Sequence, residues 1–261
     1  MTKISDIIAY LHTIAPYELQ EDYDNSGLIV GNPNTEVKGT LFCLDSTEAI
    51  VDEAIALGVN LIVAHHPIVF RGLKRFNDAN YVERTVIKAI KNDIAILSIH
   101  TNLDNVIEGV NGMISDKLGL IDKEILSFKK GYDQIGAGLI SRLPQPMPIL
   151  DFVKHLKTKM QLDVVKTTHW CHEHISEVAV CGGSGSFLLG AAKKAGAQVF
   201  ISADFKYHEY FDAENDIIII DIGHFESEKF TIDLLYSLIS KKFTNFAAHY
   251  TKIITNPVKF I

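Results

Sequence analysis

Three short, strongly apolar segments of this chain each lead into a histidine within a few residues. Each segment has the length of a buried strand, and stretches with helical spacing of apolar residues lie between them. The segments and their histidines are residues 61–64 with His65, residues 94–99 with His100, and residues 217–221 with His224. This alternation of strands and helices predicts an α/β fold with much parallel strand pairing.

A second series of strands and helices begins near residue 130. With 261 residues, the chain lies at the border between one large domain and two small ones. We therefore expect two similar α/β lobes, each with a mixed sheet flanked by helices. The expected first lobe comprises residues 1–126 and 227–261, and the second lobe comprises residues 127–226.

Two local patterns in the second half give further expectations. Residues 144–148 contain three of the seven prolines of the chain, which predicts a loop between elements. The spacing of apolar residues over 226–241 predicts one long helix.

Acidic residues outnumber basic ones, with 32 Asp and Glu against 25 Lys and Arg, giving a net charge of −7. This balance argues against general nucleic-acid binding, which requires a basic surface. Three widely spaced cysteines form neither a disulfide framework nor a zinc-ribbon motif. The N-terminus lacks the apolar core of a signal peptide, and no apolar run is long enough to span a membrane. We expect a cytoplasmic protein without membrane contact.

Histidines and carboxylates follow the three strands where α/β folds place ligands, just past the carboxyl ends of strands. These side chains are His65, His66, His100, Asp104, His224 and Glu228. Even three imidazoles and two carboxylates from this set are too many ligands for one tetrahedral site, and they suit two metals with open positions. Taken singly, each group also fits a turn, a hydrogen-bonded cap or an ordinary helix surface.

A specific resemblance supports the metal interpretation. The chain resembles the Nif-three-like dinuclear-metal family, whose members are often named GTP cyclohydrolase type 2 homologues. The motifs that carry the resemblance are residues 23–31 (YDNSGLIVG), 43–47 (CLDST), 64–68 (AHHPI), 100–104 (HTNLD), 202–208 (SADFKYH), 223–228 (GHFESE) and 255–257 (TNP). They cover nearly the whole chain in family order, and the chain is similar to the short form that lacks an inserted domain.

The resemblance implies a dinuclear metal centre in the cleft between the two lobes. His66 and His224 would hold one metal, His65 and Asp104 the other, and Glu228 would bridge both. Zn, Fe, Mn, Co and Ni all suit such imidazole and carboxylate ligands. The family also implies a toroidal homohexamer.

Several polar residues near these motifs are candidates for supporting roles. His100 and His208 are the candidate proton-transfer residues, because imidazole titrates near neutral pH. Asp204 matches a family position and is expected to line the cleft. Three further residues either orient ligand histidines or serve as turn and cap residues: Asp24, Asn25 and Asp45.

Two other segments resemble sites less closely. Residues 169–174 (HWCHEH) hold three histidines and a cysteine, but an exposed polar edge or a subunit contact is the expected role. The glycine-rich residues 182–185 stand between a strand and a helix, where backbone N–H groups can hold phosphate. A tight turn is the expected role there. Lys206 is expected either to contact an anion or to be solvated.

The expected function is metal-dependent hydrolysis of a nucleotide or a phosphorylated small molecule. The family name suggests opening of the imidazole ring of GTP, and phosphoester hydrolysis would use the same site. Bound metals would attract a small anionic substrate despite the acidic chain. The alternative is a non-catalytic protein that binds metal for delivery or assembly, because a fold does not determine a reaction.

Overall fold

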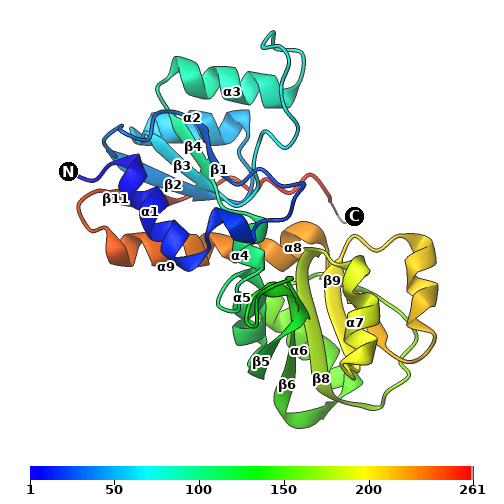
Figure 1. Cartoon of the computed structure of the whole chain (residues 1–261). Helices are drawn as coiled ribbons and strands as arrows, with labels where there is room; N and C mark the ends of the chain where they lie inside the picture. The colour runs from blue at the N-terminus through cyan, green and yellow to red at the C-terminus, as the bar shows by residue number, and fades with distance from the viewer. Residues whose placement is uncertain (260) are drawn as a thin grey trace. The chain divides into compact units, whose positions relative to one another are not determined.

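The computed structural model describes residues 1–259 and 261, and the chain divides into two compact units. Unit 1 comprises Met1–Leu103 with Thr231–Lys259, and unit 2 contains Asp104–Phe230. Each unit has a mixed sheet with flanking helices, which confirms the predicted α/β fold class (Figure 1). The lobe boundaries expected from the sequence stay predictions, because compact packing alone does not show that a segment folds independently.

Unit 1 contains a five-stranded sheet in the order β1-β4-β3-β2-β11. Its strands are β1 (Gly27–Val30), β2 (Gly39–Cys43), β3 (Leu61–Ala64), β4 (Ala95–Ser98) and β11 (Ala247–Tyr250). The four strands β11, β2, β3 and β4 run parallel, and β1 is antiparallel to β4. Every residue of β2, β3 and β4 is buried, as expected for parallel strands with both faces covered.

Helices α1 (Ile4–Ile14) and α9 (Thr231–Lys242) lie on one side of this sheet, and α2 (Glu48–Leu57) and α3 (Tyr81–Lys91) on the other (Figure 1). Two short helical segments, η1 (Tyr17–Leu19) and α4 (Thr101–Asp104), complete the unit, with the last residue of α4 entering unit 2. The ends of α2 are fixed by its capping residues. The Thr47 hydroxyl accepts the N–H of Ile50, and Gly58 ends the helix at a φ of 68°.

Unit 2 contains a six-stranded sheet in the order β5-β6-β8-β9-β10-β7. Its strands are β5 (Ile121–Phe128), β6 (Gly136–Pro148), β7 (Lys166–Thr167), β8 (His174–Ser184), β9 (Val199–Ala203) and β10 (Ile218–Asp221). The central strands β8, β9 and β10 are parallel. The other pairs are antiparallel: β5 with β6, β6 with β8, and β7 with β10.

Helices α5 (Val110–Leu118) and α6 (Ile149–Met160) pack on each other, and both contact β6 and β8. The helical segments η2 (Ser186–Leu188), α7 (Leu189–Lys194) and η3 (Tyr207–Ala213) lie on the other face of the sheet. Their apolar side chains form a buried cluster with alternate residues of β8, β9 and β10. The short α8 (His224–Glu228) lies against β8 and β9.

Two local expectations are wrong. The proline-rich residues 144–148 continue β6 instead of forming a loop. Beyond Arg142 this strand pairs only with β8, and its register shifts between Arg142 and Met147, so the missing proline N–H groups are tolerated. The long helix expected over 226–241 is divided into α8 and α9 by a turn at Lys229 and Phe230. There the ring of Phe230 packs beneath the Lys117 ammonium, 3.5 Å from the ring centroid.

The parallel register brings the motif residues of each unit to one edge of its sheet. Ala64 of β3 pairs with Ser98 of β4, so the segments that carry His65 and His100 leave the sheet side by side. In unit 2, Ser202 of β9 pairs with Asp221 of β10, and both strands lead into candidate site residues. No helix in the described part of the chain is both long and apolar enough to cross a membrane.

Candidate metal centre

Three histidines of unit 1 converge at the carboxyl ends of β3 and β4. The ring centroids are 4.9 Å apart for His65 and His66, 5.1 Å for His65 and His100, and 5.2 Å for His66 and His100. One nitrogen from each ring lies within 4.8 Å of the other two, which is close enough for a shared cation. The sequence analysis predicts that His100 transfers protons. In the structure His100 is also close enough to His65 and His66 to bind the same cation.

His65 is fully buried, and its Nδ1 lies 2.8 Å from the carbonyl oxygen of Ile99. A carbonyl oxygen only accepts, so Nδ1 carries the proton and the neutral ring has its lone pair on Nε2. The Ser98 hydroxyl donates to the His65 carbonyl at 2.8 Å, which fixes the backbone as well. The fold thus selects the His65 tautomer that binds metal through Nε2.

A carboxylate holds His66 in the same manner. His66 Nδ1 lies 2.7 Å from Asp45 Oδ1, and the Thr255 hydroxyl donates to Asp45 Oδ2 at 2.6 Å. The structure confirms the interpretation of Asp45 as a residue that orients a candidate ligand histidine. Sequence reasoning assigned no role to Thr255, although it lies in the closing TNP motif; that motif was the signal that could have found it.

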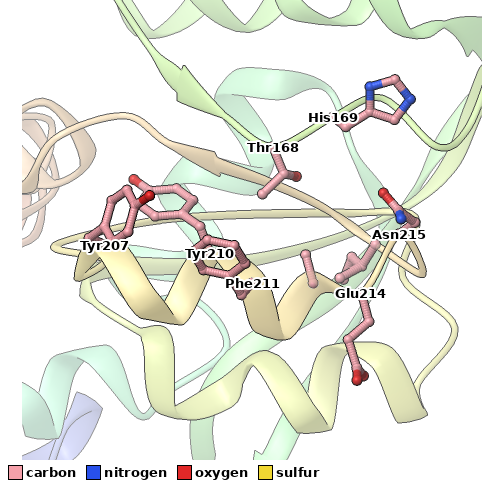
Figure 2. Close-up of a pocket in the computed structure, with 9 residues that line it drawn as sticks. Thr168, His169, Tyr207, Tyr210, Phe211, Glu214 and Asn215 are labelled. Atoms are coloured by element: carbon pink, nitrogen blue, oxygen red, sulfur yellow. The ribbon is translucent and has the colours of Figure 1, made fainter.

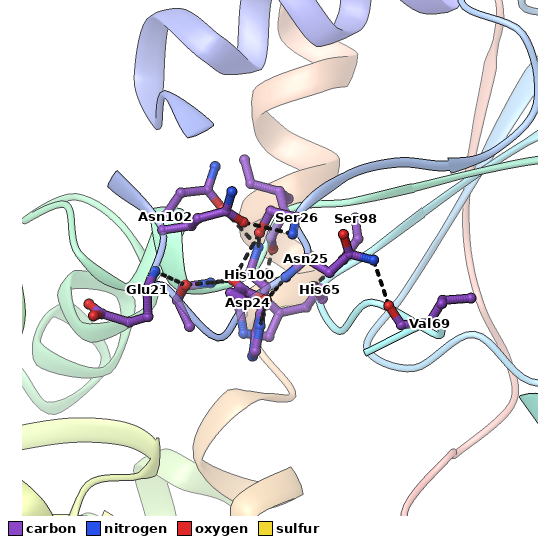
Figure 3. Close-up of polar contacts among 12 residues, drawn as sticks. Glu21, Asp24, Asn25, Ser26, His65, Val69, Ser98, His100 and Asn102 are labelled. Carbon is purple, nitrogen blue, oxygen red and sulfur yellow. Dashed lines mark hydrogen bonds and ion pairs between the residues drawn. The ribbon is translucent and has the colours of Figure 1, made fainter. Parts of the chain in front are cut away.

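Asp24 holds His100, and Figure 3 shows the polar contacts around this pair. His100 Nδ1 lies 2.7 Å from Asp24 Oδ1, and Oδ2 of the same carboxylate accepts from both the N–H and the hydroxyl of Thr101, at 3.0 and 2.5 Å. The N–H of Asn25 and the hydroxyl of Ser26 also donate to Asp24, at 2.7 and 3.1 Å. Burial would raise the pKa of Asp24, but these hydrogen bonds and the charge of His100 hold the pKa well below its usual value.

Of the two roles left open for Asn25, its hydrogen bonds within the described residues favour the structural one, because they go to Asp24 and to a backbone carbonyl. Its side-chain amide donates to the carbonyl oxygen of Val69 at 2.6 Å, and this bond ties together two loops of unit 1 (Figure 3).

Unit 2 supplies a histidine–carboxylate pair on α8. His224 Nε2 lies 3.1 Å from Glu228 Oε2, because residues four positions apart share one face of the helix. His224 Nδ1 lies 2.6 Å from Asp204 Oδ2. Asp204, which was expected to line a cleft, holds His224 in the way that Asp45 holds His66.

The glycine-rich residues 182–185 lie next to Glu228 of this pair. Gly183 has a φ of 63°, and a Cβ there would fall 2.4 Å from Glu228 Oε1. Its N–H donates to the Ser227 hydroxyl at 2.9 Å, and the N–H of Gly182 donates to the side chain of Asn111 at 2.8 Å. Glycine is therefore required because β8 passes directly beside the carboxylate of Glu228.

Asp104 lies in the same part of unit 2 as Glu228. The thiol of Cys181 is buried, and its pKa is raised by burial and by the negative charges of Asp104 and Glu228. Two carboxylates close to one buried thiol form an anionic region, which a divalent cation would stabilise.

Asp221 fixes the loop between β10 and α8. Its fully buried Oδ2 accepts from the Lys166 ammonium at 2.9 Å, the Tyr210 hydroxyl at 3.0 Å and the Phe205 N–H at 3.3 Å. Its Oδ1 accepts the N–H of Gly223 at 3.0 Å, one residue before His224. Sequence reasoning missed this residue, although an acidic residue directly after four isoleucines was a signal.

The remaining candidates make other contacts. The His208 ring lies 5.2 Å from the Tyr207 ring, and Lys206 donates its N–H to Glu209 at the start of η3. In the described part of the chain, residues 169–174 bring no three ligand atoms together, and His172 contacts the carbonyl of Asp216 at 3.0 Å.

The donor chemistry of both units fits a divalent transition metal. His65, His66 and His224 each hold Nδ1 against a fixed oxygen, which directs Nε2 toward a ligand position. A donor set rich in imidazole nitrogen suits Zn and its neighbours in the first transition row, whereas Ca and Mg prefer ligand sets made of oxygen atoms.

Comparison with known proteins identifies the family. The family model for Duf34/NIF3 (NGG1p interacting factor 3) matches residues 2–257. This chain belongs to that family. A Clostridium perfringens protein described as a GTP cyclohydrolase 1 type 2 homolog is 36% identical over 228 residues, which cover 87% of each chain.

Solved structures show the same fold as this NIF3 family member. A hypothetical protein from Staphylococcus aureus superposes with a TM-score of 0.90 at 29% identity, over 99% of both chains. A Bacillus cereus protein related to NIF3 also has a TM-score of 0.90, at 24% identity, over 100% of this chain and 99% of the other. The family resemblance inferred from the sequence motifs is confirmed.

Proposed function

We propose that this protein binds two divalent transition-metal ions and uses them to hydrolyse a nucleotide or a phosphorylated small molecule. The observation that carries the proposal is the shared arrangement of His65, His66 and His224. Each ring has its Nδ1 held by an oxygen, from Ile99, Asp45 and Asp204 respectively. This arrangement is typical of metal-ligating histidines, because the second hydrogen bond fixes both the tautomer and the ring orientation.

The proposed ligands follow the family assignment. His66 and His224 bind one ion, His65 and Asp104 bind the other, and Glu228 bridges them. Two divalent ions there would polarise a substrate oxygen and lower the pKa of a water to near neutrality.

The residues around the ligands have distinct proposed tasks. Asp24 fixes the proton of His100 on Nδ1, which leaves Nε2 to accept a proton or to return it to a leaving group. His208 is the second proposed proton-transfer residue. Asp45 and Asp204 keep the ligand histidines in place while substrate enters and leaves.

The substrate class rests on charge and on the names of relatives. A centre with two divalent ions attracts phosphate even in a chain with a net charge of −7. The name of the Clostridium perfringens relative favours opening of the imidazole ring of GTP. Phosphoester hydrolysis is the second candidate reaction, since the same centre would serve it.

The first test is metal analysis of protein purified without added metal. We expect about two equivalents of a transition metal in the wild type and a clear loss in His66→Ala and Glu228→Ala. His12→Ala is the matched control, because His12 pairs with Glu18 on the surface of unit 1. Full metal content in both ligand variants would refute the site.

The second test separates an enzyme from a protein that binds metal only for delivery or assembly. The metal-loaded protein is incubated with GTP, other nucleotides and simple phosphoesters, and products are followed by chromatography and phosphate release. An enzyme turns over at least one of them, and His208→Ala lowers the rate while retaining the metals. Absence of turnover with every substrate favours the non-catalytic function.

The assembly and the compartment are also proposals. We propose a toroidal homohexamer in the cytoplasm, from the family resemblance and from the absence of a disulfide framework. The three cysteines are free in this structure. A particle mass six times the 29.1 kDa of one chain would support the hexamer, and a monomer would refute it.

A further inference from the structure

Unit 2 contains an aromatic pocket of about 430 Å³ that the proposed metal ligands do not line. Figure 2 shows Tyr207, Tyr210 and Phe211 grouped along η3, with Thr168 and His169 on the segment across from them. This volume is within the range of sites that bind small organic molecules, and it suits a ligand with one or two fused rings.

Two of the aromatic side chains are unusually exposed. Tyr207 is 73% exposed and Phe211 is 65% exposed, and their ring centroids lie 5.6 Å apart in a T-shaped arrangement. Large apolar rings gathered on a surface are costly in water and mark binding sites. Their faces are available to stack against a planar ligand.

The third ring is held in place. The Tyr210 hydroxyl donates to the buried Asp221 at 3.0 Å, and the ring lies 5.5 Å from that of Phe205. Burial and the nearby charge of Asp221 raise the pKa of Tyr210, so the phenol keeps its proton and its hydrogen bond. A rigid wall lowers the entropy cost of binding a ligand.

The charge of the pocket excludes anions. Its lining, all within the described residues, contains the acidic Glu214 and neither lysine nor arginine. The nearby Lys193 ammonium pairs with Glu214 and Asp216, at 2.8 and 3.0 Å, and is thereby neutralised. A phosphate would therefore be repelled here, in contrast to the proposed metal centre.

We propose that this pocket binds an uncharged planar heteroaromatic ring, and that a free nucleoside is the class of ligand that fits it. The base stacks on the face of Tyr207 or Phe211 and meets the other ring edge to face, because the two ring planes are 72° apart. Thr168, His169 and Asn215 offer polar atoms at the other side and end of the pocket. Because none of these residues is a proposed metal ligand, binding is independent of metal content.

The experiment uses the full-length protein and two probes, adenosine and guanosine. Trp170 is the single tryptophan of the chain and directly follows His169, so its fluorescence reports on the pocket. We expect a saturable fluorescence change, together with saturation-transfer NMR signals from the base protons. Removal of metal with a chelator leaves this binding unchanged, and in the metal-free protein the addition of phosphates to the nucleoside weakens it.

Two exposed substitutions test the site without disturbing the core. Tyr207→Ala and Phe211→Ala should each weaken nucleoside binding about tenfold, and Tyr207→Phe should retain it. Phe187→Ala is the matched control, because Phe187 is 69% exposed in the same unit but does not line the pocket. Circular dichroism confirms that all four variants fold.

Any of the following results would overturn the proposal. One is the lack of saturable binding of either nucleoside to the wild type. Another is equal binding by wild type, Tyr207→Ala and Phe211→Ala, or binding that disappears with the metal. The third is that no nucleoside binds, that the particle mass of the wild type depends on protein concentration, and that both alanine variants lower this mass. Such a result would assign the rings to contact with a second copy of the chain.

Discussion

Thr255 donates a hydrogen bond to Asp45 across 210 positions of sequence, at 2.6 Å. The other oxygen of that carboxylate lies 2.7 Å from His66 Nδ1. The C-terminal segment makes two further hydrogen bonds to the same part of unit 1: Glu53 accepts from the Thr251 hydroxyl and from the Lys252 N–H. The C-terminal segment therefore helps to position a proposed metal ligand, although it contributes none itself.

Loss of the Thr255 hydroxyl should weaken metal binding. Thr255→Val keeps the shape of the side chain but leaves Asp45 with one partner fewer, so His66 is held less firmly. We expect about a tenfold loss of affinity for Zn or Co, whereas Thr255→Ser should be near wild type. Competition titration with a chromophoric chelator measures this, and equal affinities in the valine variant and the wild type would contradict it.

Gly183 should not tolerate a side chain. Gly183→Ala places a Cβ 2.4 Å from Glu228 Oε1 on a backbone with a φ of 63°. We expect a loss of about 1–3 kcal/mol in the free energy of unfolding, measured with urea. Gly190→Ala is the control, because a Cβ there meets no atom within 4 Å and α7 gains a better helix former. Similar losses in the two variants would refute the argument.

Asp24 should make stability depend on acid. Its pKa is lowered in the folded protein, so its contribution is present above the unfolded pKa of about 4 and is lost as the pH falls below that value. The stability of the wild type should therefore fall more steeply between about pH 5 and pH 3 than that of Asp24→Asn. Asp22→Asn, an exposed neighbour, should follow the wild type in urea titrations across this range. A parallel loss in wild type and Asp24→Asn would show that Asp24 is not responsible.

Asp221 should be far more sensitive than its partner Lys166. Asp221→Asn replaces a fully buried carboxylate that accepts four hydrogen bonds, and we expect a loss of about 2–4 kcal/mol. Lys166→Gln removes an ammonium that is 62% exposed, and water replaces its contact at a cost below about 1 kcal/mol. Both values come from urea unfolding. Equal losses of unfolding free energy in the two variants would mean that the ion pair with Lys166 dominates over the other hydrogen bonds of Asp221.

The sequence by itself determined the elements with strong local signals. The apolar segment 61–64 is a strand with those bounds, and Thr47 and Gly58 delimit α2 as capping residues should. The helical spacing of His224 and Glu228 already placed them on one face. Local rules failed where pairing overrode them: the prolines of β6 are accommodated because that stretch of the strand pairs only with β8.

Tertiary structure alone decided how the candidate ligands are held. The oxygens that fix His65, His66 and His224 come from Ile99, Asp45 and Asp204, and each lies 20 to 34 positions away. The Thr255 hydroxyl reaches Asp45 across 210 positions, and the Lys166 ammonium reaches Asp221 across 55. Spacing reveals which residues share a helix face or follow a strand, because both depend on neighbouring backbone geometry. Which oxygen meets which ring nitrogen depends on the packing of distant segments, and only the folded chain specifies it.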